Sequence, residues 1–489
     1  KRQVKLASLP GAQQQLAQDL RALIQQLSSL SLKPEQRKRL KVQQQELEKQ
    51  LYRLLPELKP RIVEVEQVAD VLPREGVLIE YQRYQPFNGR KPPGERWGEA
   101  HYLAIVLKPD GSIAVVDLGV AAVIDQTISQ AVEAIEEGLS DSPELLAKVS
   151  QRVLAPLREA TAGAKTWFIS PDGELNRLPF AALTADGGGD YLSEVVDLRL
   201  LTTGRELLDL QKTAKNVASD VVVVADPAYG LKTDRIKIAS RSHSEADVSV
   251  RRSADLSDQL QWDRLENTAK EGKAIQGLIG GELLMREEAT AEAIKRRATP
   301  QVLHLATHAF YLPNQTKPDP PASTSALGDQ RRSRGAVLTA SLQGESSLLR
   351  SGVAMAGANQ PTANPTDDGY LTALEVAQLD WDGTELVVIS ACESGRGDIQ
   401  SGEGVYGLKR AIAVAGARSS LLSLWKVDDG ATAAFMQSFY ERLKAGEGRA
   451  DALAATQQEF REHQIPGWRH PYVWAAFQLS GDWGPIQGL

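Results

Sequence analysis

The sequence predicts an α/β protein with a mostly parallel sheet that is covered by helices on both faces. From about residue 122, short apolar strands alternate with segments of helical periodicity. Several strands, such as 221–225 and 386–389, are continuous apolar runs, which is typical of strands buried on both faces. The chain has 489 residues, enough to bury a large core without disulfide bridges.

Residues 1–72 are predicted to form a helical hairpin arm that precedes the sheet. Leucine and isoleucine recur at helical spacing between residues 16 and 30 and again between 40 and 55, and Pro34 separates the two stripes. We expect this arm to pack, to dimerise or to bind a regulatory protein partner. The chain begins with Lys1 rather than Met, so we expect a piece of a longer protein.

Residues 73–140 are predicted to form a β-rich segment. The patterns at 77–81, 101–107 and 112–118 are those of strands, and Lys108-Pro109-Asp110-Gly111 predicts the turn between the last two. Residues 85–99 are rich in proline, glycine and charge, which indicates an exposed loop.

The remaining elements belong to a third unit, residues 141–489. Its predicted strands are 166–169, 221–225, 301–307, 385–390, 419–424 and 472–479. The helices predicted from residue 122 onwards are 124–135, 145–157, 269–279, 405–414, 432–443 and 450–462. Two polar stretches, 230–262 and 313–368, do not fit a compact core and are predicted as long surface loops.

Composition and motifs exclude several classes of function. The 56 basic and 63 acidic residues give a net charge of −7, so no nucleic-acid partner is expected. No apolar run approaches the roughly 18 residues of a membrane helix, so no membrane partner is expected. The single cysteine, Cys392, excludes a disulfide framework and a cysteine-rich metal site, and fits a cytoplasmic protein. Phosphate-loop, zinc-helix and serine-elbow motifs are absent, so no cofactor is expected.

Two reactive side chains follow predicted strands directly. His308 follows the predicted strand 301–307, and Cys392 follows the predicted strand 385–390. Ligand sites gather at the carboxyl ends of strands in open α/β sheets, and a thiolate with a nearby imidazole is the minimum set for cysteine peptidase chemistry. A lone cysteine there is often only a small buried hydrophobe. The glycine-rich stretch 395–404 favours a substrate groove instead.

The motifs around these residues resemble a known family. They are His-Leu-Ala-Thr-His at 304–308, Ser-Ala-Cys-Glu-Ser-Gly at 390–395, Gly-Glu-Gly at 402–404 and Leu-Trp-Lys-Val-Asp-Asp at 424–429. Together they resemble the CHAT peptidases, which are bacterial caspase-like proteases related to separase and often carried behind TPR repeats. The resemblance spans about 141–489. It implies a CHAT domain with an N-terminal part at 141–215 and a caspase-like catalytic core at 216–489.

The resemblance also implies roles for individual residues. Cys392 would attack the scissile carbonyl, and His308 would be the general acid and base, with His304 in a structural role. The backbone N–H groups of Cys392 and Ala309 would hold the oxyanion. The family usually has glycine after the histidine, so Ala309 is a departure, and its N–H fits only if φ is negative. No Asp or Asn that orients the histidine is evident from spacing.

An acid after the strand 419–424 lines the S1 pocket in separase-like relatives, which implicates Asp429 first and Asp428 second. Ser390 would also line S1, because its small side chain leaves room for a long one. A buried carboxylate selects a basic P1 residue, Arg ahead of Lys. The alternative is that one acid caps the next helix.

Three functions are compatible with these residues. The favoured one is a cysteine endopeptidase that cleaves a specific protein substrate, with self-cleavage expected at Arg331, Arg332 or Arg334 in the long loop. The chief alternative is a catalytically silent caspase-like scaffold that acts by protein–protein binding. An acyltransferase or non-peptide hydrolase would use the same two side chains.

Overall fold

The computed structural model describes residues 63–185, 189–212, 220–230, 262–297, 299–311, 351–359, 369–390, 392–393 and 403–489. A few isolated positions before residue 63 and position 218 are also described. The predicted helical arm therefore lies almost wholly outside the described residues. So do Arg331, Arg332 and Arg334.

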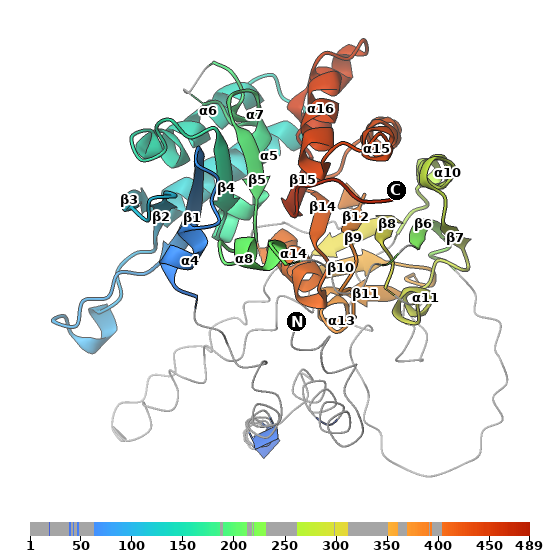
Figure 1. The fold of residues 1–489 in the computed structure, drawn as a ribbon, viewed down its shortest axis with the longest axis horizontal. Helices are drawn as coiled ribbons and strands as arrows, with labels where there is room; N and C mark the ends of the chain where they lie inside the picture. The colour runs from blue at the N-terminus through green and yellow to red at the C-terminus, as the bar shows by residue number, and fades with distance from the viewer. Residues whose placement is uncertain are drawn as a thin grey trace, which may run out of the picture.

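Eleven strands form one large sheet with the order β3-β2-β1-β4-β5-β15-β14-β12-β8-β6-β7 (Figure 1). Their bounds are β1 Gly76–Tyr84, β2 His101–Leu107, β3 Ile113–Val120, β4 Thr166–Ser170, β5 Asp197–Leu200, β6 Val221–Pro227, β7 Glu282–Arg286, β8 Val302–Ala306, β12 Leu386–Ile389, β14 Ser419–Ser423 and β15 Phe477–Gly481. Only β1·β2, β2·β3 and β14·β15 pair antiparallel, and the other neighbours are parallel. The predicted α/β class with a mostly parallel sheet is confirmed.

Alternate residues of the central strands enter two different cores. In β12, Leu386 and Val388 face one apolar cluster, whereas Val387 and Ile389 face another. This period of two is what an extended strand imposes, and it explains why buried parallel strands are continuous apolar runs. The first cluster is covered by α5, α6, α10, α15 and α16, and the second by α11, α13 and α14.

The bounds of the helices are α4 Val65–Ala69, α5 Ala121–Glu136, α6 Ser142–Val153, α7 Leu192–Val195, α8 Glu206–Leu210, α10 Glu266–Ile279, α11 Ala291–Lys295, α13 Ala373–Val376, α14 Glu403–Ala415, α15 Asp429–Lys444, α16 Arg449–Arg461 and α17 Pro471–Trp474. A third, smaller cluster lies under α4 and α8, where Leu78 and Phe168 of the sheet meet Leu207. No helix among the described residues is long and apolar enough to cross a membrane.

A second sheet of four short strands continues from the large one, with the order β11-β10-β9-β13. Its strands are β9 His308–Tyr311, β10 Ser351–Ala354, β11 Tyr370–Thr372 and β13 Cys392–Glu393. Because β9 follows β8 and β13 follows β12 along the chain, the chain passes from the carboxyl edge of the large sheet directly into the small one. This small sheet carries both predicted catalytic residues.

The structure departs from the sequence-based expectations in three places. The strand predicted at 472–479 begins only at Phe477, because Pro471 starts the short helix α17, which the His470 side chain caps by accepting from the Tyr472 N–H. The stretch 313–368 is not loop throughout, since it contains β10. The β-rich segment joins the same large sheet as the core, because β1 pairs with β4; the domain boundaries themselves stay a prediction.

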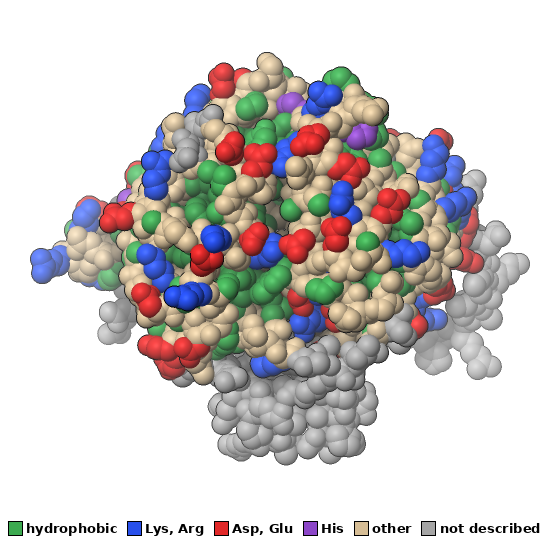
Figure 2. All heavy atoms as spheres, turned by 45° about the horizontal axis from the view of Figure 1, so that its top comes forward, with side chains coloured by type: hydrophobic (Ala, Val, Ile, Leu, Met, Phe, Trp, Pro, Cys, Tyr) green, Lys and Arg blue, Asp and Glu red, His purple; other side chains and the backbone are tan. Residues whose placement is uncertain are grey.

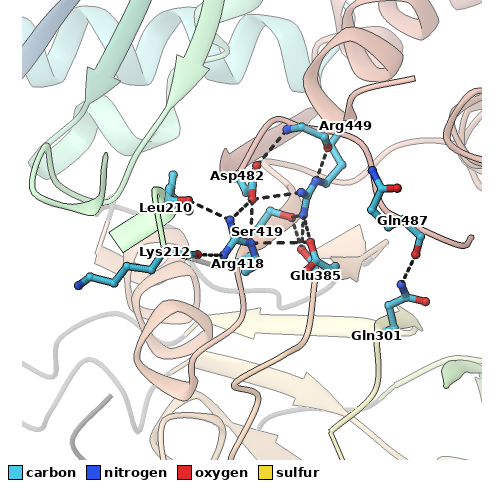
Figure 3. Close-up of polar contacts among 10 residues, drawn as sticks. Leu210, Lys212, Gln301, Glu385, Arg418, Ser419, Arg449, Asp482 and Gln487 are labelled. Atoms are coloured by element: carbon cyan, nitrogen blue, oxygen red, sulfur yellow. Dashed lines mark hydrogen bonds and ion pairs between the residues drawn. The ribbon is translucent and has the colours of Figure 1, made fainter. Parts of the chain in front are cut away.

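A buried ionic network lies at the sheet edge opposite the small sheet (Figure 3). Arg449, from the start of α16, is only 1% exposed and lies between Glu385 and Asp482, at 3.2 Å from a carboxylate oxygen of each. Arg418 pairs with Asp482 at 2.6 Å. Glu385 precedes β12, Arg418 precedes β14 and Asp482 follows β15, so the network holds three strand ends together.

Candidate active site

The backbones of His308 and Cys392 are direct neighbours. Strands β8 and β12 pair in the large sheet with Leu305 opposite Ile389. Both chains then continue into the small sheet, where β9 and β13 pair in parallel with His308 opposite Cys392 and Ala309 opposite Glu393. Neighbouring strands lie roughly 4.8 Å apart, so the two residues come together although they are distant in the sequence. The side chain of Cys392 is outside the described part of the structure.

The imidazole of His308 is enclosed by aromatic side chains. It is 2% exposed and lies between Trp262 and Tyr229, with ring centroids 5.1 and 5.2 Å away. Its Nε2 is 2.8 Å from the backbone carbonyl oxygen of Asp263. The Tyr229 hydroxyl is 2.9 Å from that of Thr307, which donates to the carbonyl of Ala354.

The carbonyl of Asp263 determines the tautomer of His308. A carbonyl oxygen can only accept, so Nε2 carries the proton. In the neutral ring the basic lone pair is then on Nδ1. This is the orienting role for which spacing in the sequence identified no Asp or Asn, and here a main-chain group fills it.

The segment that supplies this carbonyl is held from two sides. Asn359 brackets Trp262, accepting its N–H at 2.8 Å and donating to its carbonyl at 2.9 Å. The indole N–H of Trp262 is 3.2 Å from the hydroxyl of Tyr370. These contacts tie the segment to the small sheet, because Tyr370 lies in β11 and Asn359 follows β10.

Arg264, the residue after Asp263, anchors the segment 262–264 to the end of β6. Its Nε and Nη2 bind the two carboxylate oxygens of Asp226 at 2.9 and 2.7 Å. Arg286 adds a third contact at 3.1 Å. Asp226 is 1% exposed, whereas both arginines are about half exposed. Asp226 and Arg286 have φ of 46° and 53°, the only positive values among the described non-glycine residues, and such strain persists where surrounding contacts over-determine it.

Two smaller residues lie beside His308 and Cys392. Ser390 is 4% exposed, its N–H donates to the Leu305 carbonyl, and among the described residues its hydroxyl has no hydrogen-bond partner. A buried hydroxyl without a partner is costly unless a ligand or water satisfies it. Ala309 is half-buried, and its φ is not positive. Its backbone conformation therefore allows its N–H to serve the oxyanion.

Asp428 caps α15. Its Oδ1 accepts from the N–H groups of Gly430 and Ala431, both at 3.0 Å, and the residue is exposed. Asp428 therefore has the helix-capping role that the sequence offered as the alternative to lining the S1 pocket. Asp429 is the first residue of α15, and its side chain is outside the described part of the structure.

His304 lies in β8, on the face of the large sheet that α10 and α15 cover. It is completely buried, with Nε2 3.1 Å from Glu271 of α10 and Nδ1 3.2 Å from the hydroxyl of Tyr440 of α15. Burial raises the pKa of Tyr440 well above its ordinary value, so its phenol stays neutral and available as a hydrogen-bond partner. These contacts give His304 a structural position between the sheet and two helices.

Sequence reasoning missed the residues that surround His308. Asp226 stands at the carboxyl end of a buried strand, so the strand-end rule that singled out His308 could have singled it out as well. Trp262 was placed at the edge of a polar stretch, and a main-chain carbonyl such as that of Asp263 has no signature in a sequence. No group of three or more metal-ligating side chains occurs in the parts of the chain that are described.

The fold and the site define an α/β protein with a histidine and a cysteine on adjacent strands beyond the carboxyl edge of a parallel sheet. The chain belongs to the CHAT domain family, whose model matches residues 143–482, more than half of the chain.

Among curated proteins the chain is similar to tetratricopeptide repeat protein 28. The human protein is 25% identical over 319 residues, and the mouse protein is 24% identical over 322 residues. Each match covers 63% of this chain but only 12% of the relative, so the chain spans about an eighth of the length of these relatives.

Among solved structures the chain is similar to the Saccharomyces cerevisiae separase–securin complex, with a TM-score of 0.46 and 8% identity over 94% of this chain and 32% of the other. It is also similar to the Arg-specific cysteine proteinase gingipain R, with a TM-score of 0.35 and 9% identity over 74% of each chain. Because both TM-scores lie below 0.5, the functional proposal rests on the family match and on the residues of this chain.

Proposed function

We propose that the chain is a cysteine endopeptidase that cleaves a specific protein partner through Cys392 and His308. The single observation that carries the proposal is the parallel register of the two residues on β13 and β9. The contact between His308 Nε2 and the Asp263 carbonyl adds to it, since it leaves the basic lone pair on the other ring nitrogen.

The proposed reaction has two stages. His308 takes the proton of the Cys392 thiol, and the thiolate attacks the scissile carbonyl carbon, while the backbone N–H groups of Cys392 and Ala309 hold the oxyanion. The imidazolium then gives its proton to the leaving amine, which breaks the peptide bond and leaves a thioester. Water, deprotonated by His308, attacks the thioester and restores the free thiol.

An electrophilic probe tests this function. We expect an Arg-ketone peptide to label wild-type protein at Cys392, as mapped by mass spectrometry, and to label His308→Ala at least about 100-fold more slowly, within the range of general-base catalysis. A Lys409→Met variant serves as a folded comparison. Absence of both labelling and cleavage, even with candidate partner proteins present, would favour the scaffold that acts only by binding.

The S1 pocket is proposed to select Arg ahead of Lys at P1 through Asp429, with Ser390 beside it. The buried hydroxyl of Ser390, which has no hydrogen-bond partner in the described part of the chain, supports a ligand at this position. Asp429→Asn should lower cleavage of Arg and Lys substrates about 10-fold or more relative to neutral P1 residues, because a charge-assisted contact is lost. Asp428→Asn keeps a capping side chain and is the matched control. Equal P1 profiles for Asp429→Asn and wild type would remove Asp429 from S1.

Self-cleavage after Arg331, Arg332 or Arg334 is proposed from the same preference for basic residues. Pure wild-type protein and Cys392→Ala are incubated, and their termini are mapped by mass spectrometry. New termini at these positions in wild type alone are expected, and identical intact masses would contradict self-processing.

A narrower proposal rests on the sequence motifs alone, namely that the chain acts in heterocyst differentiation in filamentous cyanobacteria. The measurement is heterocyst spacing in a strain in which the chromosomal copy carries Cys392→Ala. A pattern identical to that of wild type would contradict this role.

A further inference from the structure

A second site lies where the two halves of the large sheet meet. Strands β5 and β15 run in parallel, yet only Leu200 and Ser480 are paired between them. Along the rest of their length the strands line a cavity of about 90 Å³, which α16 borders on one side. Figure 2 shows a hollow on this face, with hydrophobic side chains inside and charged side chains around it. We call this cavity the seam pocket.

The walls of the seam pocket are mainly apolar. Phe180, Leu198, Leu453, Phe477, Leu479 and Trp483 are among its lining residues. A volume of about 90 Å³ suits one large aliphatic side chain rather than a cofactor.

Along the facing edges of β5 and β15, two backbone carbonyls accept hydrogen bonds from side chains instead of from a neighbouring strand. The Leu198 carbonyl of β5 accepts from Arg199 Nη1 at 3.3 Å, and the Phe477 carbonyl of β15 accepts from Gln457 Nε2 at 3.2 Å. Open strand edges beside an apolar cavity are the arrangement by which proteins bind extended peptides, since the edges recognise the backbone and the cavity recognises a side chain.

Two glutamines in the wall add unused acceptors. Gln457 and Gln478 are 4% and 8% exposed, and each donates through Nε2 to a backbone carbonyl, that of Phe477 and that of Leu178. No residue in the described ranges donates to the amide oxygen of either glutamine. Neither oxygen is among the buried side-chain atoms without a partner, so both are open to the pocket, where peptide N–H groups can donate to them.

The rim of the pocket is acidic. Asp197 and Asp451 are exposed lining residues, and their one cationic neighbour in the lining, Arg199, is paired with Asp451 at 2.9 Å. The second carboxylate, that of Asp197, therefore has no paired cation in the pocket lining. A lysine or arginine next to the apolar side chain of a ligand would complement it.

We propose that the seam pocket binds an extended segment of a protein partner, with one large apolar side chain in the cavity and a Lys or Arg beside it at the rim. The seam pocket extends along β15 from Phe477 to Gly481. Its Phe477 end lies at the same sheet edge as Cys392, because Phe477 pairs with Ser423 at the end of β14, which pairs in turn with β12. Two strand spacings, about 10 Å, separate β15 from β12. The binding needs no thiol chemistry, so it stands independently of the proposed peptidase activity.

The experiment is a selection of random linear peptides on the full chain carrying Cys392→Ala, which prevents cleavage. We expect the enriched peptides to share a large apolar residue next to Lys or Arg. Ala454→Trp should plug the cavity from an exposed position of α16 and weaken binding of a selected peptide by at least about 10-fold, as expected where an anchoring side chain is excluded. Gln458→Trp, exposed on the same helix but outside the lining, should bind like the parent.

Asp197→Asn, nearly isosteric and exposed, supplies a second variant that should fold normally. It should weaken the peptides that carry Lys or Arg several-fold and leave an apolar control peptide unchanged. No enrichment of any motif, or equal affinity for Ala454→Trp and Gln458→Trp, would overturn the proposal. Self-association of the chain that Ala454→Trp abolishes would also overturn it, because the occupant would then be a second copy.

Discussion

At the scale of single residues, the orientation of His308 depends on a backbone group rather than on a carboxylate. The Asp263 carbonyl holds Nε2, and Arg264 fixes the next residue to Asp226 through two hydrogen bonds. The sequence motifs could identify His308 and Cys392, since their chemistry is in their side chains. They could not identify Asp263, because any residue carries a carbonyl and only the fold aims it.

Arg264→Lys tests this arrangement. Lysine keeps the charge but loses the two-pronged contact with Asp226, so the Asp263 carbonyl should become less well placed. We expect kcat/KM to fall about 10-fold, equivalent to roughly 1.4 kcal/mol.

The matched control is Arg286→Lys, which alters the other arginine on the same carboxylate without touching the segment next to Asp263. It should leave kcat/KM near that of wild type. Equal effects of the two substitutions would mean that Asp226 acts only in general stability.

At the scale of elements, the sequence predicted the long buried strands and amphipathic helices but not the short strands of the small sheet. The patterns for β6, β8 and β12 were clear because apolar runs reflect burial on two faces. Strand β13 has only two residues, and its existence depends on pairing with a distant segment, so local pattern cannot show it. The start of β15 was misplaced because apolar residues in α17 continue the apolar run.

Replacing Arg449 tests how much the buried ionic network contributes to the free energy of unfolding. Arg449→Met removes the charge that lies between Glu385 and Asp482 and leaves those partly buried carboxylates with Arg418 alone. Breaking a buried pair in this way typically costs about 3–5 kcal/mol. We expect a loss of this size in the free energy of unfolding, measured with urea at neutral pH. Arg442→Met, which breaks partly exposed pairs with Glu447 and Glu459, should cost less than about 1 kcal/mol.

The same network predicts an effect of acid. Burial alone would raise the pKa of Asp482, but Arg449, the Gly484 N–H and Arg418 outweigh it and hold the pKa below the ordinary 3.8. A carboxyl group with a lowered pKa stabilises the fold above its unfolded pKa and loses that contribution as pH falls towards its folded pKa. The stability difference between wild type and Arg449→Met should therefore shrink below about pH 4. A difference that is constant down to the acid transition would contradict this assignment.

At the scale of the whole molecule, the first and second halves of the sheet share one core but little strand pairing. Side chains from β1 and β4 belong to the same apolar cluster as those from β14, α15 and α16. Beyond the Leu200–Ser480 pair, polar contacts cross the junction. Arg418 donates to the carbonyls of Leu210 and Lys212 (Figure 3), and Lys409 of α14 donates to that of Leu201 at 3.0 Å. We therefore expect both halves to unfold in one transition.

Lys409 makes the stability of this junction depend on pH. A lysine in an ordinary ion pair loses its stabilising effect as pH rises, whereas the contribution of Lys409 should increase. Burial lowers the pKa of Lys409 to about 8 from 10.5, although the charge of Glu206 opposes the shift. Between pH 8 and 10.5 the unfolded chain thus binds one more proton at this residue than the folded chain. Stability from this residue should accordingly rise with pH in that window, by up to about 1.4 kcal/mol per pH unit.

The measurement is the free energy of urea unfolding of wild type and Lys409→Met at several pH values across this window. Groups that do not interact with Lys409 titrate equally in both proteins, so the difference between the two slopes reports on Lys409 and on Glu206, whose pKa the ammonium helps to lower. The free energy of unfolding of wild type should increase relative to that of Lys409→Met as pH rises. The reason is that the lysine loses the charge that burial disfavours, while its amine remains next to the Leu201 carbonyl. Parallel slopes would show that the buried ammonium keeps its proton, and that Glu206 rather than desolvation dominates at the junction between the two halves.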